Sequence, residues 1–99
     1  MVRLIALFNT PDDPAAFDAH YRDVHTPIVH RYPGLRELRL SRTSPPGPME
    51  MPFYLMAEMV FDDRGALDAA LASDAGRESA RDLRNFAGAG VQIFVAEDA

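Results

Sequence analysis

The chain contains no cysteine and no lysine among its 99 residues. The absence of cysteine excludes thiol nucleophiles, disulfides, iron–sulfur clusters and thiolate zinc sites. The absence of lysine excludes Schiff-base chemistry, including lysine-anchored pyridoxal phosphate, and the lysine of a P-loop. Several classes of covalent, redox and metal chemistry are therefore closed to this sequence.

The chain also lacks a net positive charge and long apolar runs. Its net charge of -5 argues against binding to nucleic acids or anionic membranes, because neither polyanion attracts an acidic protein. No apolar run approaches the roughly 18 residues of a membrane span, and the N-terminal segment is typical of a strand and not of a signal peptide. We expect a cytoplasmic protein, and its partners should be small molecules or other proteins.

Length and composition are those of one ordinary globular domain, covering residues 1–99. Hydrophobic patterns and turn residues predict strands at about 2–9, 35–43, 53–61 and 91–96. The predicted helices begin at the caps Asp13, Asp62 or Asp63, and Ser73, and end near residues 32, 73 and 86. The order strand, helix, strand, strand, helix, strand predicts an α+β fold with a ferredoxin-like βαββαβ antiparallel sheet.

Several of the predicted strands are apolar on both faces, although the helices can cover only one face of the sheet. A second copy of the chain, packed sheet to sheet by two-fold symmetry, would cover the other face. We therefore expect a homodimer in the form of a dimeric α+β barrel. The space between its two sheets would be the ligand cavity.

The first predicted helix carries an apolar stripe and a histidine. Phe17, Tyr21, Val24 and Ile28 share one helical face, and His25 continues the row from Phe17 through Tyr21. Pro27 follows closely and should kink the helix or make it restart, because proline lacks an N–H and crowds the carbonyl four residues earlier. It should also bias Thr26 away from helical geometry, and if the helix restarts there, Thr26 would be its N-cap.

The pattern F-x-x-x-Y-x-x-x-H-x-P, followed by Pro33-Gly34, resembles the EthD family of small bacterial proteins. A second stretch, from Phe61-Asp62 to the sequence DLRNF at 82–86, resembles a later block of that family. The resemblance spans most of the chain and implies a dimeric α+β barrel. It also implies a link to oxidative degradation pathways.

His25 is the main candidate for a catalytic residue, since a neutral histidine suits proton transfer near neutral pH. The alternative is a structural imidazole bonded to a free carbonyl at the kink. Tyr21 could orient His25 or a ligand hydroxyl, or could simply be part of the core. Glu58 is the second pocket candidate because it interrupts an apolar strand, and its alternative is an ion pair with an arginine such as Arg3.

Metal and cofactor sites are not expected. His20 and His30 lie five positions on either side of His25, about 140° away around an α-helix, so the three should not converge on one ion. Haem ligation by one histidine is an alternative that no residue favours. Asp82 and Asn85 match the family block, but we interpret them as local capping residues.

Two functions remain open. The first is a cofactor-independent enzyme, such as a monooxygenase, isomerase or cyclase, which acts on a small apolar molecule bearing a carbonyl or phenol group. His25 would move the proton. The second is a non-catalytic protein that binds a pathway intermediate or assists a monooxygenase partner. An acid–base pair beside a pocket favours the enzyme, whereas a histidine bonded only to backbone favours the binder.

Overall fold

The structure is a computed structural model that describes the whole chain, residues 1–99. One antiparallel sheet has the strand order β2-β3-β1-β4, so that β1 and β3 are central and β2 and β4 are the edges. The strands are β1 (Val2–Asn9), β2 (Glu37–Arg42), β3 (Phe53–Phe61) and β4 (Val91–Glu97). The predicted strands are therefore confirmed, with shifts of a residue or two at the ends of β2 and β4.

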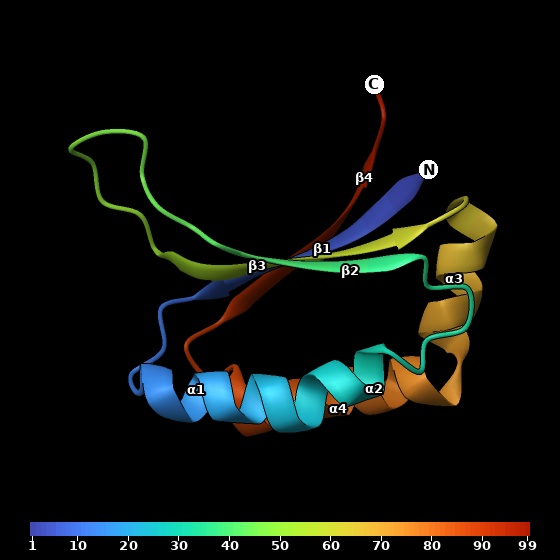
Figure 1. Cartoon of the computed structure of the whole chain (residues 1–99), viewed down its shortest axis with the longest axis horizontal. Coiled ribbons are helices and arrows are strands. Elements are labelled where there is room, and N and C mark those ends of the chain that lie inside the picture. Colours follow the sequence, from blue (N-terminus) through green and yellow to red (C-terminus); the bar gives the residue numbers. More distant parts are fainter.

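All helices lie on one side of this sheet, as Figure 1 shows. They are α1 (Pro14–His20), the π-helical turn η1 (Tyr21–His25), α2 (Thr26–Val29), α3 (Arg64–Ala72) and α4 (Asp74–Phe86). Side chains of Asp13, Asp63 and Ser73 cap α1, α3 and α4 by accepting a hydrogen bond from a backbone N–H. The βαββαβ order on an antiparallel sheet confirms the ferredoxin-like α+β fold. None of these helices combines the length and the apolar character of a transmembrane span.

The helix does not break at Pro27. Instead it widens just before the proline, where the backbone N–H of Thr26 bonds to the carbonyl of Tyr21, five residues earlier. This π-type turn accommodates the proline ring while the chain stays helical. Thr26 keeps helical torsion angles, so the expectation that Pro27 biases it away from helical geometry is wrong, and the helix does not restart there.

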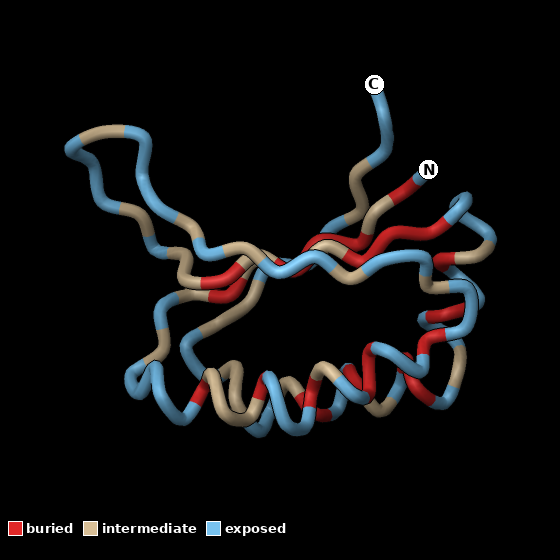
Figure 2. Tube along the Cα trace, in the orientation of Figure 1, coloured by how far each residue is buried: buried red, intermediate tan, exposed pale blue.

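The core lies between the sheet and the helices. Alternate residues of β1 and β3, among them Phe8 and Phe61, point towards the helices and are almost fully buried. Phe17, Val29 and Leu67 meet them from the helical layer. Figure 2 shows these buried segments facing one another across the interior.

The opposite face of the sheet has no helix. Its residues alternate with those of the core and include Ile5, Leu7, Met56 and Phe94, the last of which is 44% exposed. The loop between β2 and β3 rises on this same side in Figure 1, away from the helices. It therefore does not cover the space between helices and sheet.

Candidate functional site

His25 ends the π-helical turn and points into the space between helices and sheet. Its side chain is only 5% exposed. The ring lies among aromatic neighbours, with its centroid 5.2 Å from that of Tyr21 and 4.8 Å from that of Phe86. His25 lies on the side of the sheet that the helices cover, whereas the space expected between two sheets would lie on the opposite, uncovered side.

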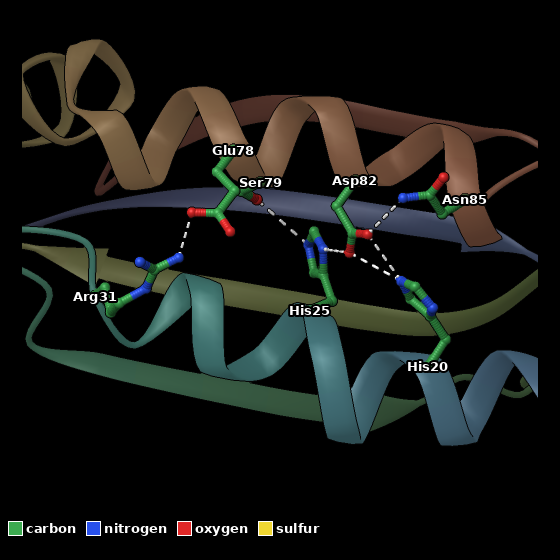
Figure 3. Close-up of polar contacts among 7 residues, drawn as sticks. All are labelled: His20, His25, Arg31, Glu78, Ser79, Asp82 and Asn85. Atoms are coloured by element: carbon green, nitrogen blue, oxygen red, sulfur yellow. Dashed lines mark hydrogen bonds and ion pairs between the residues drawn. The ribbon is translucent and has the colours of Figure 1, made fainter.

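Asp82 on α4 is the partner of His25. The Nδ1–H of His25 donates to Oδ2 of Asp82 at 2.9 Å. The same carboxylate accepts bonds from Nε2 of His20, at 2.9 and 3.0 Å, and from the side-chain amide of Asn85 at 3.0 Å. Figure 3 shows these groups converging from η1, α1 and α4. A buried carboxylate with three donors from other side chains is held in one orientation.

Burial and hydrogen bonding set the charges of this pair. Burial raises the pKa of Asp82, but bonds from Asn85, His25 and His20 outweigh it, so the net pKa is lowered and the carboxylate is ionised. Burial lowers the pKa of His25 below its ordinary 6.5, against the opposing effect of Asp82. An ionised carboxylate can only accept hydrogen bonds, so the proton of neutral His25 lies on Nδ1. Its Nε2 therefore carries the free lone pair.

A small apolar cavity of about 120 Å³ lies beside His25. Most of its walls are hydrophobic, including Leu4, Met59 and Leu83, and its polar groups come from His25, Ser79 and two tyrosines, Tyr21 and Tyr32. Ser79 is buried on α4, and its Oγ lies 3.4 Å from Nε2 of His25. Leu71 and Ile93 line the cavity and are 40% and 49% exposed, so they mark its opening to solvent.

Tyr21 is part of the same wall and also of the aromatic core. Its ring contacts those of Phe8 and Phe17, and burial raises the pKa of its phenol. Tyr21 borders a second, open groove as well, of about 460 Å³, formed with Asp18, Arg22 and Arg42. The tyrosine therefore separates two hollows, and its phenol stays neutral.

Glu58 lies elsewhere. It sits on β3 opposite Ile5 and Arg39, on the face of the sheet without helices. It makes no ion pair with Arg3, which instead contacts Asp98 at 3.6 Å. Glu58 and His25 therefore do not share a cavity. A role for Glu58 remains a prediction that concerns the uncovered face alone.

Asp82 was missed as a site residue, and His20 was expected to diverge from His25. The capping interpretation of Asp82 and Asn85 is wrong for Asp82, whose side chain reaches across to another helix. His20 and His25 reach one carboxylate because the i to i+5 bonding of a π-turn brings residues five apart to the same side. The signal in the sequence was Pro27, since a proline within a helical pattern often marks such a distortion. No group of three or more histidine or acidic side chains is placed to hold a metal ion.

A comparison of the chain with models of known protein families supports the resemblance seen in its sequence motifs. The model of the EthD domain matches residues 9–90. The chain belongs to the EthD family. The match includes the whole His25–Asp82 pair, with His20 and Asn85, so these residues lie within the family's domain.

Two relatives of this EthD protein extend over nearly all of its length. A Rhodococcus erythropolis protein named "uncharacterized 11.0 kDa protein in thcB-thcC intergenic region" is 31% identical over 98 residues, which cover 99% of this chain and 95% of that protein. The crystal structure of an ethyl tert-butyl ether D (EthD) family protein from Bacillus halodurans is 42% identical, with a TM-score of 0.90. The alignment covers 100% of this chain and 99% of that one.

A more distant structure shows the fold alone. It is SnoaB from Streptomyces nogalater, a cofactor-independent oxygenase, with 21% identity and a TM-score of 0.71. The alignment covers 98% of the EthD chain and 91% of SnoaB. The EthD fold is thus shared with an oxygenase.

Proposed function

We propose that this protein binds a small, largely apolar molecule bearing a carbonyl or phenol oxygen, and that His25 exchanges a proton with it. The observation that carries the proposal is the neutral imidazole beside the apolar cavity, with its Nδ1–H held by Asp82 at 2.9 Å. An orienting carboxylate behind a histidine leaves the other ring nitrogen free as a base. Tyr21 is proposed to shape the wall next to it.

The cavity determines the kind of molecule that fits. Its volume of about 120 Å³ is close to that of an apolar cavity that binds benzene, about 150 Å³. One ring therefore fills the space, and any larger part of a ligand must extend past Leu71 and Ile93. Ser79 and Tyr32 are the hydroxyl groups that can meet the ligand's oxygen near His25.

The reaction class follows from what the histidine can do. Removing a proton from a phenol or from the carbon beside a carbonyl gives a phenolate or enolate, with the proton held on Nε2 of His25, and such an anion can go on to react in an oxygenation, an isomerisation or a cyclisation. The oxygenase activity of SnoaB, a protein of the same fold, is consistent with this proposal. The pairing of His25 with a carboxylate, and not with backbone, favours catalysis over simple binding.

A proton-exchange assay tests the proposal directly. Cyclohexanone and phenol serve as one-ring probes: binding is measured by calorimetry, and loss of the α-hydrogens of cyclohexanone in D₂O by NMR. We expect the wild-type protein to bind and to accelerate exchange, and His25→Asn to bind but exchange at least about 100-fold more slowly. His30→Asn is the matched control, because His30 is exposed and makes no side-chain hydrogen bond.

Two results would count against this function. Binding without exchange would favour the accessory, non-catalytic protein. If neither probe binds and native mass spectrometry finds no co-purified small molecule, the cavity is not a ligand site and the proposal fails.

We propose further that the protein is a homodimer through the uncovered face of the sheet. Phe94 is a large apolar residue that stays 44% exposed there, with Leu7 and Met56 partly exposed around it. A second copy would bury this surface without a third layer of helices. The loop between β2 and β3 projects on the same side, where it could contact the partner (Figure 1).

Sedimentation equilibrium at micromolar concentration tests the dimer. We expect about twice the 11.0 kDa chain mass for the wild type and a monomer for Phe94→Asp, because a carboxylate cannot be buried unpaired between two sheets. Val24→Asp is the control, since Val24 is similarly exposed, at 42%, but lies on the helical side. A wild-type species of 11.0 kDa would refute the barrel.

A further inference from the structure

Asp82 holds two imidazoles that differ in their access to solvent. His25 is on the cavity side, with 5% of its side chain exposed, whereas His20 is on the outer side, with 24% exposed. The two histidines bond to one carboxylate from opposite directions, as Figure 3 shows. His20 is thus a titratable group close to the surface, and it shares with buried His25 the one carboxylate of the site, that of Asp82.

The ring of His20 is also fixed in place. It stacks on Phe86 with centroids 5.0 Å apart and an angle of 23° between the planes. Phe86 in turn contacts the ring of His25 at 4.8 Å. His20 borders an open groove of about 450 Å³ between α1 and the C-terminal end of α4. Water and ions therefore reach His20 without entering the cavity beside His25.

We infer that His20 is a positioning residue of the site, which holds Asp82 from the solvent side and makes His25 a weaker base when His20 is charged. A proton on His20 engages the carboxylate more strongly and leaves less of its negative charge to stabilise the imidazolium of His25. The catalytic consequence of this coupling rests on the proposed function of His25. The coupling itself does not.

Other titratable and charged groups lie around His20 and His25. Tyr21 and Tyr32 face His25, and burial raises the pKa of both phenols, so they stay neutral and add no charge beside it. Around the groove, the charged neighbours of His20 are Asp12, Asp13 and Arg84. Asp13 is engaged in capping α1. His20 is thus the titratable group that contacts Asp82 directly from outside.

An NMR titration of the histidine rings tests this coupling without any ligand. In ¹⁵N-labelled protein, the wild type should show His25 with its proton on Nδ1. In His20→Gln, whose amide can donate to Asp82 but carries no charge, the titration midpoint of His25 should move to higher pH. His30→Gln is the control and should leave that midpoint unchanged.

A second pair of variants shows whether the effect passes through Asp82. Adding His20→Gln to Asp82→Asn should produce a clearly smaller shift of His25, because the shared carboxylate is gone and only the direct repulsion between the two imidazoles remains. An unchanged His25 midpoint in His20→Gln would overturn the inference, as would an equal shift in the Asp82→Asn background. Because the titration uses protein without a ligand, its outcome does not depend on the outcome of the proton-exchange assay. If both hold, the pH profile of exchange should move to higher pH in His20→Gln, in step with the midpoint of His25.

Discussion

Replacing Asp82 by alanine should destabilise the protein by about 3 kcal/mol or more, because it leaves the donors of His20, His25 and Asn85 without their shared acceptor. That is a large part of the roughly 5–15 kcal/mol of a typical domain. Urea unfolding at neutral pH measures the change. Asp68→Ala is the matched control: its carboxylate pairs with Arg64 but is 61% exposed, so the cost should be below about 1 kcal/mol. Equal losses in both variants would show that Asp82 has no special role in the fold.

Asp82 also contributes to the pH dependence of stability, in a direction that its lowered pKa determines. The unfolded chain takes up a proton near pH 3.8, whereas the folded carboxyl resists it, so stability is lost as the pH falls through this region. The Asp82→Asn variant has no carboxyl at this position, so it should not lose this part of its stability when the pH falls. The other lowered carboxyls, those of Asp18, Asp23 and Asp62, are present in both proteins, so the difference reports the carboxyl of Asp82 together with the effect of its charge on His25. Unfolding curves above and below pH 3.8 test this.

Replacing Gly76 by alanine should cost about 3 kcal/mol or more, since α4 crosses the end of α3 at this residue without room for a side chain. An added Cβ would lie 2.3 Å from the carbonyl oxygen of Ala70 and 2.6 Å from that of Leu71. Both contacts are with backbone, so no side-chain rotation can relieve them. Gly76 also lines the cavity beside His25, and the two helices would have to separate there.

Thermal unfolding measures this effect, which should lower the melting temperature by about 15 °C in a domain of this size. Gly88→Ala is the control, because a Cβ at Gly88 meets no atom within 4 Å and its φ angle is not in the left-handed region. That variant should melt within a few degrees of the wild type. Similar melting temperatures for both variants would mean that the contact between α3 and α4 is not as tight as described.

Local patterns were sufficient for most of the fold. The strand limits of β1 and β3, the caps at Asp13 and Ser73, and the order of the elements follow from alternation, turn residues and side-chain capping, which act within a few residues. The family resemblance depends on the same short-range spacing, and the match to residues 9–90 confirms it. Pro27 was correctly placed as a distortion. Its outcome, a widened turn, depends on how the helix packs against the sheet.

The sequence by itself indicated an α+β fold of the EthD family with a sheet face that its helices leave uncovered and a histidine at the end of an apolar stripe. Only the tertiary structure decided which groups act together. Asp82 lies 57 positions from His25, and its role arises because α4 packs beside η1. Strand alternation placed Glu58 on one face, but the helices, by covering the other face, removed it from the site of His25. Contacts between distant segments depend on packing, and no local spacing encodes them.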